Sequence, residues 1–363
     1  MSNASLATRR LTRRAVTVLT TAALIAGLAA CGDDEQATNT DGSLNTIDLT
    51  FTISSTSLAH QLVYAARDGG FFEKYKINAN LVAADSSAVA MAALVSGSAQ
   101  VAFVGRSEGI TTSASGQKVL YAYKHSIGFL SNVTVSKKFA DKHPGFESMS
   151  VEQRLKALDG ATIAQASANG VLTRVLNNAM ADVGASVKNT YVATNTMPTT
   201  LSRGAVDGYM APSPFQETSV QRGEGVTWIK GTELPGSGGE TIVQGATIVT
   251  EKFLKSDRDK VVRVIAALQA TAEAMKADEA KAKQLARDRL KDTDQAIFDA
   301  MWQGTYPCIV GPADHQVSAD DIKFMIENDA ADVEGAKSLD PAGLIVPQDV
   351  VDDAKKLVAQ IGS

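Results

Sequence analysis

The stretch that decides the fold is residues 66–105, ARDGGFFEKYKINANLVAADSSAVAMAALVSGSAQVAFVG. It contains two apolar strand patterns, 77–84 and 100–105, on either side of a short apolar segment with helical boundaries. Asp85-Ser86-Ser87 precedes that segment and Gly97 follows it; serine caps free helical N–H groups and glycine tolerates the left-handed conformation that ends a helix. The order strand, helix, strand predicts a parallel βαβ unit.

The same alternation continues on both sides of this stretch. On the N-terminal side, 46–53 is a β-branched strand pattern, and a helical pattern from Leu58 stops at Gly69-Gly70. Downstream, Ser150 and Gln153 have the spacing of a capping box at a helix start. From Ser256 the pattern is almost wholly helical. Between residues 105 and 256, further strand patterns lie at 118–123, 128–136, 161–166, 189–193, 206–212, 225–231 and 243–250.

A second βα unit begins near Val135 and is set between two parts of the first. We therefore expect an α/β fold with two lobes of mostly parallel sheet, joined by two crossing strands near 131–135 and 245–250. The expected boundaries are a signal peptide at 1–30, a flexible tether at 31–43, lobe 1 at 44–132, lobe 2 at 133–247, and a return to lobe 1 with C-terminal helices at 248–363.

The N-terminus has the features of an export signal. Arg9, Arg10, Arg13 and Arg14 precede an apolar segment at 15–30, which is shorter than a membrane-spanning helix. Leu28-Ala29-Ala30-Cys31 resembles the lipobox of bacterial lipoproteins, and the resemblance implies that Cys31 is lipidated and anchors the exported chain to the membrane. The alternative is an ordinary signal peptide with an incidental cysteine.

Composition excludes several function classes. The first 30 residues hold four of the 35 basic residues and none of the 40 acidic ones, so the chain from Cys31 carries a formal charge of −9. This argues against a nucleic-acid partner, because basic faces supply most of that binding. With Cys31 lipidated, only Cys308 remains, so no internal disulfide is expected; we interpret Cys308 as a small buried hydrophobic residue. The four histidines show no metal-ligand spacing, and we expect no metal, no cofactor and a monomer.

Three stretches resemble one family of solute-binding proteins of ABC importers, the group serving nitrate, aliphatic sulfonates, taurine and a thiamine-precursor pyrimidine. They are residues 66–105, residues 201–226 (LSRGAVDGYMAPSPFQETSVQRGEGV) and residues 249–275. Gln100 departs from the acidic residue usual before the third strand. The resemblance implies a type II periplasmic-binding fold, whose lobes close over a small molecule and present it to an ABC permease and its ATPase, with no catalysis.

Ligands of open α/β sheets bind outside the carboxyl ends of the strands, and five strand ends here are rich in polar residues. Hydroxyl groups there precede helix starts, whose free N–H groups favour an anion. The alternative is that these residues only cap helices. The predicted ligand-binding residues are Ser54, Ser55, Thr56, His60, Gln61, Ser86, Arg106, Ser107, Lys124, Ser167, Asn169, Tyr209, Phe215 and Gln216.

Arg106 carries the ligand prediction, because its planar guanidinium suits carboxylate, sulfonate or phosphate. The alternative for Arg106 is an ion pair with Glu108 or an acid of lobe 2, and for Tyr209 a place in the core. We expect a small organic anion or zwitterion, first an aliphatic sulfonate or taurine. The alternatives are a thiamine-precursor pyrimidine or another aromatic ligand, a pyrimidine-synthesising enzyme, and a sensory ectodomain.

Overall fold

The structure is a computed structural model that describes residues 44–168, 170–310 and 315–362. The signal peptide, Cys31, the tether and Asn169 lie outside the described residues. The described residues fall within one compact unit. Among the described helices, none is both long enough and apolar enough to span a membrane.

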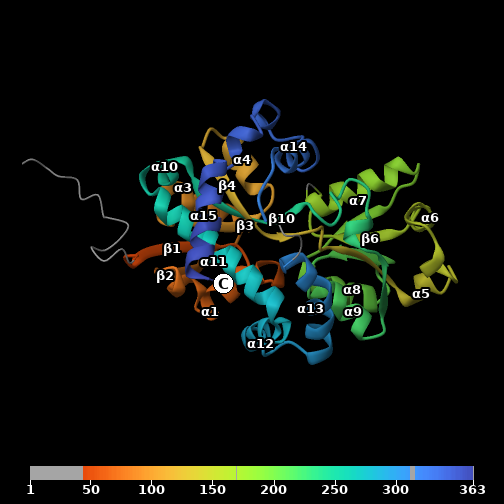
Figure 1. Ribbon diagram of the computed structural model, residues 1–363. Coiled ribbons are helices and arrows are strands. Elements are labelled where there is room, and N and C mark those ends of the chain that lie inside the picture. Colours follow the sequence, from red (N-terminus) through yellow and green to blue (C-terminus); the bar gives the residue numbers. More distant parts are fainter. Residues whose placement is uncertain (1–43, 169, 311–314, 363) are drawn as a thin grey trace, which may run out of the picture. The chain divides into compact units, whose positions relative to one another are not determined.

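Two mixed sheets of five strands organise the fold, with orders β2-β1-β3-β10-β4 and β7-β6-β8-β5-β9 (Figure 1). In each sheet four strands share one direction, and the fourth in order, β10 or β5, is antiparallel to both neighbours. The first sheet contains β1 (Ile47–Ile53), β2 (Ile77–Ala83), β3 (Val101–Gly105), β4 (Val119–Ile127) and β10 (Val243–Thr250). The second contains β5 (Asn132–Ser136), β6 (Thr162–Gln165), β7 (Lys188–Tyr191), β8 (Gly208–Ala211) and β9 (Gly225–Ile229). This arrangement confirms the predicted α/β class with mostly parallel sheets.

Helices cover both faces of each sheet. Those between the strands are α1 (Gln61–Asp68), α2 (Phe71–Lys74), α3 (Ser87–Ser96), α4 (Glu108–Ala114), α5 (Lys137–Ala140), α6 (Val151–Ala157), α7 (Val171–Asp182), α8 (Met197–Ser202) and α9 (Phe215–Gln221). The C-terminal helices are α10 (Glu251–Ser256), α11 (Arg258–Ala277), α12 (Glu279–Arg289), α13 (Gln295–Val310), α14 (Ala319–Asn328) and α15 (Gln348–Ile361). Short 3₁₀ turns include η1 (Leu58–His60). The capping box predicted at Ser150 and Gln153 is confirmed at the start of α6.

The strand β3 shows why its sequence is apolar throughout. Val101 and Phe103 belong to one hydrophobic cluster, whereas Ala102 and Val104 belong to the cluster on the opposite face. Successive side chains of a strand point to opposite faces, so a strand covered on both faces has no polar position left. The second sheet likewise separates two hydrophobic clusters.

The chain passes between the two sheets at 128–131 and at 230–242, since β4 ends at Ile127, β5 begins at Asn132, β9 ends at Ile229 and β10 begins at Val243. The crossings predicted at 131–135 and 245–250 lie later in the chain, largely within β5 and within β10. The first connection and β5 form one continuous segment without a turn signal, so hydrophobic periodicity does not separate them, whereas the second connection is polar and glycine-rich and contains a 3₁₀ turn at Gly231–Glu233. The predicted end of lobe 2 at residue 247 falls inside β10.

The two connecting segments touch backbone to backbone at Gly231. A Cβ atom there would lie 2.2 Å from the carbonyl oxygen of Phe129 and 2.4 Å from that of Ser131. The Gly231 N–H donates to Asn132 Oδ1 over 2.9 Å. Only glycine permits this approach, so the two connections are held together as one unit.

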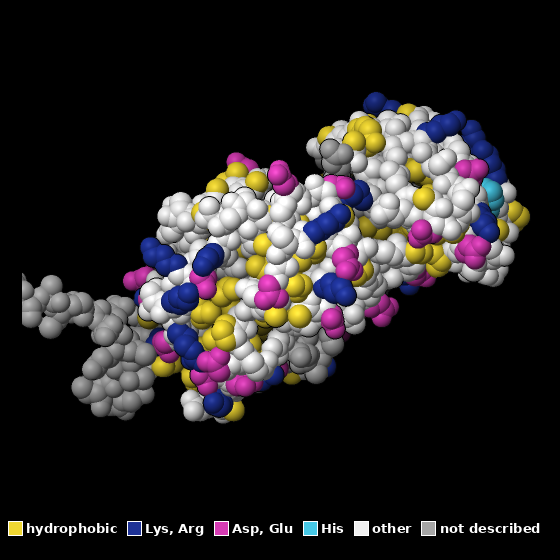
Figure 2. Space-filling view, turned by 90° about the horizontal axis from the view of Figure 1, so that it is seen from above, with side chains coloured by type: hydrophobic (Ala, Val, Ile, Leu, Met, Phe, Trp, Pro, Cys, Tyr) yellow, Lys and Arg dark blue, Asp and Glu magenta, His cyan; other side chains and the backbone are white. Residues whose placement is uncertain are grey.

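Surface charge is mixed. Over the first-lobe part of the face shown in Figure 2, at the left, Lys and Arg side chains are interspersed with Asp and Glu. Mixed surface charge of this kind produces no strong field of one sign.

Candidate functional site

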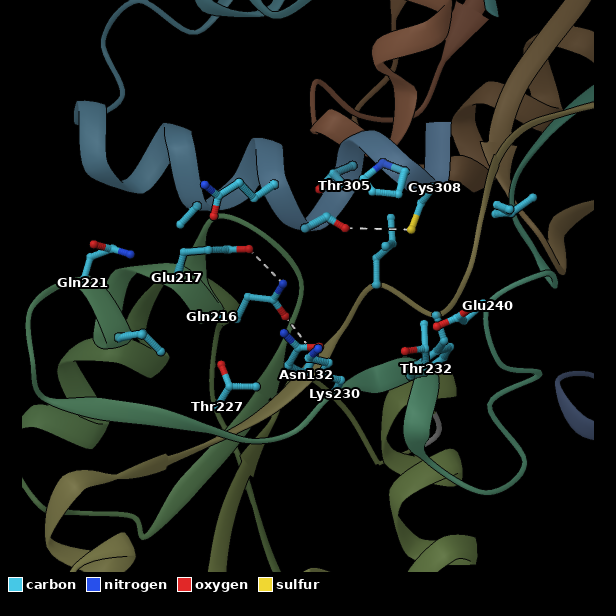
Figure 3. Close-up of a pocket in the computed structure, with 18 of the residues that line it drawn as sticks. Asn132, Gln216, Glu217, Gln221, Thr227, Lys230, Thr232, Glu240, Thr305 and Cys308 are labelled. Carbon is cyan, nitrogen blue, oxygen red and sulfur yellow. Dashed lines mark hydrogen bonds between the residues drawn. The ribbon is translucent and has the colours of Figure 1, made fainter. Parts of the chain in front are cut away.

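A cavity of about 870 Å³ lies beside the two connecting segments. Its walls come from both connections, from α9 and β9 of the second sheet, and from α13 (Figure 3). Helix α13 packs against η1 and β4 of the first sheet and also against α9. The lining residues are Ile127, Phe129, Leu130, Asn132, Gln216, Glu217, Val220, Gln221, Thr227, Lys230, Thr232, Glu240, Thr241, Ala300, Gln303, Gly304, Thr305, Pro307 and Cys308.

The first turn of α9 supplies two buried polar side chains to this cavity. Gln216 Oε1 accepts the backbone N–H of Asn132 over 2.7 Å, and its Nε2 donates to Glu217 Oε1 over 2.9 Å. Ser213 Oγ also donates to Glu217 Oε1. Among the described residues, Gln216 is the predicted site residue that lines the cavity, and its amide joins α9 to the start of β5 at Asn132.

The charged side chains in the described wall give the cavity a negative balance. Glu217 and Glu240 are acidic, and Lys230 is basic. Glu217 is buried, whereas Lys230 and Glu240 are exposed at the rim. Among the described residues of the wall, the only aromatic one is Phe129. The walls therefore combine amide, hydroxyl and charged groups and offer little surface for stacking an aromatic ring.

The α13 wall includes Cys308. Burial, with the charge of Glu240, raises the pKa of its thiol to about 11. The thiol is therefore protonated near neutral pH and points to no nucleophilic role. Cys308 is half-buried rather than fully buried as expected from the sequence.

Arg106 is engaged within the protein. Its Nε lies 2.6 Å from Asp329 Oδ2, its Nη2 donates to Asp329 Oδ1 over 2.8 Å, and its Nη1 donates to the carbonyl of Ser237 over 3.1 Å. The guanidinium also lies over the rings of Phe129 and Phe324. The ion-pair alternative thus describes this structure, although the partner is Asp329 after α14 and not Glu108 or an acid of the second lobe.

His60 belongs to a buried chain of hydrogen bonds. Its Nδ1 lies 2.7 Å from His125 Nε2, and its Nε2 lies 3.5 Å from Ser54 Oγ. The other ring nitrogen of His125 lies 3.3 Å from Thr247 Oγ1. Burial, with the charge of Arg289, lowers the pKa of His60 to about 4, and burial also lowers the pKa of His125. Both rings are therefore neutral at pH 7, and a single direction of donation satisfies the whole chain.

Arg289 of α12 holds two further predicted residues. It donates to the backbone carbonyl of Thr56 and, through Nε and Nη2, to Gln61 Oε1 over 3.1 and 2.7 Å. Lys124 pairs with Asp321 over 2.8 Å. Tyr209 is fully buried and donates to the Phe215 carbonyl and to Ser219 Oγ, as the core alternative for Tyr209 expects, and Phe215 packs on the same cluster.

The predicted serines make local contacts. Ser55 Oγ accepts the N–H of Ser57, and Ser86 Oγ caps α3 by accepting the N–H of Val89. Ser107 precedes α4 without a side-chain cap bond, and the carbonyl of Ser167 accepts from Thr173 Oγ1. Ligand contact by these residues stays a prediction.

Sequence reasoning missed most of the cavity wall. Glu217 follows Gln216 directly but does not stand at a strand end, Asn132 is the first residue of β5, and Lys230 and Glu240 belong to the second connecting segment. The α13 residues come from a stretch with no strand before it. Of these missed residues, only Glu217 could have been found from the sequence, because it lies next to the predicted residue Gln216.

Comparisons with known proteins agree with this architecture. Residues 44–288 match the NMT1-like family. The chain belongs to the NMT1-like family. The match confirms the resemblance drawn from residues 66–105 and 201–226. No curated protein sequence matches this NMT1-like chain.

Solved structures share the fold of this NMT1-like protein at low sequence identity. A putative sulfonate ABC transporter periplasmic sulfonate-binding protein SsuA from Methylobacillus flagellatus KT aligns with a TM-score of 0.65 and 15% identity, covering 86% of this chain and 95% of that chain. The periplasmic aliphatic sulphonate binding protein SsuA from Escherichia coli gives 0.63 and 13%, covering 83% and 92%. The periplasmic nitrate-binding protein NrtA from Synechocystis PCC 6803 gives 0.59 and 13%, covering 88% and 91%. The type II periplasmic-binding fold predicted from the sequence is confirmed by these likenesses.

Proposed function

We propose that this NMT1-like protein is the extracytoplasmic solute-binding component of an ABC importer. It captures a small molecule and delivers it to a permease driven by an ATPase. The observation that carries the proposal is the position of the cavity, whose walls include both segments that join the two sheets. A rotation of the lobes about those segments changes the cavity, so ligand binding biases the lobe arrangement.

The ligand we propose is a small organic zwitterion of the taurine type, with other aliphatic sulfonates as the nearest relatives. Lys230 at the cavity rim supplies a cation for the sulfonate. The position of Arg106 in the sequence suggests a role in binding an anionic ligand. In the structure Asp329 neutralises the charge of Arg106, so this residue gives less support to an anionic ligand. An aromatic ligand such as a thiamine-precursor pyrimidine is the second candidate, and it is disfavoured because Phe129 is the single aromatic residue in the described part of the cavity wall.

We further propose that the exported chain is a monomer anchored to the outer face of the bacterial cell membrane through lipid on Cys31. A lipidated N-terminal cysteine bears more than one acyl chain, and stable anchoring needs about two membrane signals. The tether at 31–43 then leaves the folded part free to reach a permease in the same membrane.

The decisive experiment combines native mass spectrometry of the purified protein with calorimetry. A small molecule that co-purifies in a one-to-one complex, and whose addition to stripped protein gives saturable binding, supports the proposal. Saturable turnover of that molecule would instead make the protein an enzyme. The absence of any bound molecule, together with no heat from taurine, alkanesulfonates, nitrate or aminopyrimidines, would refute the proposal.

A further inference from the structure

Glu217 carries a carboxylate oxygen that no group of the described protein satisfies. Its Oε1 accepts from Ser213 Oγ and from Gln216 Nε2, whereas Oε2 is buried and has no hydrogen-bond partner. Within residues 44–168, 170–310 and 315–362, no Lys, Arg or His forms an ion pair with Glu217. The whole residue is only 9% exposed.

Such a group is costly unless something outside the fold pairs with it. Buried carboxylates are found paired with cations or fully hydrogen-bonded, because transfer of an unpaired charge out of water is strongly unfavourable. The two neutral donors, Ser213 and Gln216, both serve Oε1. The missing partner of Oε2 is a cation or a donor from outside the described residues, and because protein atoms cover Oε2, it reaches this oxygen only when neighbouring side chains shift.

The placement of Glu217 within the cavity limits what that partner is. Figure 3 shows its side chain extending from α9 into the space below α13. The Gln216 amide, bonded to Asn132 N–H on one side and to Glu217 on the other, fixes this orientation. Glu240 adds a second negative charge and Lys230 the only positive one among the described lining residues. The cavity is thus built for a molecule with a cationic group, and its one lysine suits an anionic group on the same molecule.

We propose that Glu217 binds the protonated amine of the ligand and thereby selects amine-bearing small molecules over plain anions of the same size. This inference rests on the proposed function and narrows its ligand to aminoalkyl zwitterions. An ammonium group donates to Oε2 and replaces the missing ion pair, and this hydrogen bond between charged groups strengthens in the water-poor cavity.

The test compares two probes that differ by one amine, taurine and ethanesulfonate. Calorimetry is performed on the wild-type chain, on Glu217→Gln and on the matched control Glu147→Gln, which removes an exposed acid of η2 (Phe146–Ser148), away from the cavity. We expect wild type to bind taurine about 10- to 100-fold more tightly than ethanesulfonate. We expect Glu217→Gln to remove that preference and Glu147→Gln to keep it. Equal affinity for the two probes in wild type, or an equal loss for both in Glu217→Gln, would overturn the inference.

A second measurement does not depend on the probes. If the Glu217 carboxylate is unpaired until a ligand amine binds, the ligand-free Glu217→Gln protein should melt at the same temperature as wild type or a higher one. The substitution then removes an unpaired buried charge. A clearly lower melting temperature means that Glu217 is engaged within the fold, which overturns the inference. Native mass spectrometry tests the role of Glu217 separately from the proposed solute-binding function. A bound molecule without a basic nitrogen would contradict the proposed role of Glu217 but would still support the proposed solute-binding function.

Discussion

Arg106 and Asp329 form a buried ion pair that links the end of β3 to the residue after α14, 223 positions further along the chain. Arg174 of α7 donates to the backbone carbonyl of the same Asp329. One aspartate therefore connects the first sheet, the C-terminal helices and a helix that covers the second sheet. Burial raises the pKa of Asp329, while the charges of Arg106 and Arg174 oppose the rise.

Replacing Arg106 with Met should destabilise the protein by about 3–5 kcal/mol, because Asp329 is left as a buried unpaired charge. The double variant Arg106→Met/Asp329→Leu should recover much of that loss. The exposed pair of Arg258 with Asp349 serves as the control, since Arg258→Met should cost less than about 1 kcal/mol. Urea unfolding measures all four proteins. Unchanged stability with lost ligand affinity in Arg106→Met would restore the ligand role expected from the sequence.

The buried pair His60 and His125 should make the protein sensitive to acid. Both folded-state pKa values lie below the ordinary value, so their contribution to stability is complete above about pH 6.5 and is lost as the pH falls towards 4. For His60 alone this loss is on the order of 3 kcal/mol. Denaturant unfolding at pH 7, 5.5 and 4.5 tests this. His60→Gln should flatten the pH dependence, whereas His143→Gln, which changes a histidine outside this pair, should not; an equal slope in all three proteins contradicts the assignment.

Cys308 should report ligand binding. Its thiol has a pKa raised to about 11 and lines the cavity, so alkylation with a maleimide should be slow at pH 7 and faster at pH 9. Saturating ligand should slow it further by covering the sulfur. Peptide mass spectrometry after timed labelling measures the rate at Cys308 separately from Cys31. Labelling that stays unchanged at saturation would place the ligand elsewhere.

The Gly231→Ala variant should separate the two connecting segments. The new methyl group meets two carbonyl oxygens closer than any real Cβ contact, so the backbone must shift at a cost of about 1–3 kcal/mol. Gly105→Ala is the matched control, because its Cβ would meet nothing within 4 Å. Thermal unfolding and ligand affinity are measured together. Wild-type behaviour of Gly231→Ala would show that the connections do not depend on this contact.

Membrane attachment should depend on Cys31. A Cys31→Ser variant should lose radiolabelled palmitate and move from the membrane fraction to the medium or periplasm, since the lipid attachment atom is gone. Cys308→Ser should leave attachment unchanged. Retention of Cys31→Ser in the membrane fraction would contradict the lipobox interpretation.

The sequence predicted the architecture well because local patterns determine it. Strands buried on both faces, such as β3, have uniformly apolar sequences, and caps such as Ser86 and Ser150 mark helix starts within a few residues. The candidate site was predicted less completely. A strand end shows where a side chain begins but not which distant residue meets it, and Arg106 meets an acid contributed by a segment with no strand pattern.

The cavity shows the same limit. Gln216 was found because it follows a strand, whereas Glu217 and Cys308 acquire their position only when α9 and α13 pack together. Such contacts arise from tertiary packing between segments about 90 residues apart. Hydrophobic periodicity indicates local secondary structure and does not predict them.

The place of β10 in the first sheet has a consequence for biogenesis. β4 pairs within its sheet only with β10, which is made after every strand of the second sheet. During synthesis or export from the N-terminus, β5 to β9 emerge as a contiguous set and can complete their sheet first. The N-terminal strands are synthesised earlier, and β3 and β4 each keep an unpaired edge until residues 243–250 insert between them. A nascent chain halted before that point exposes unpaired strand edges, the species most prone to aggregate and most in need of chaperones.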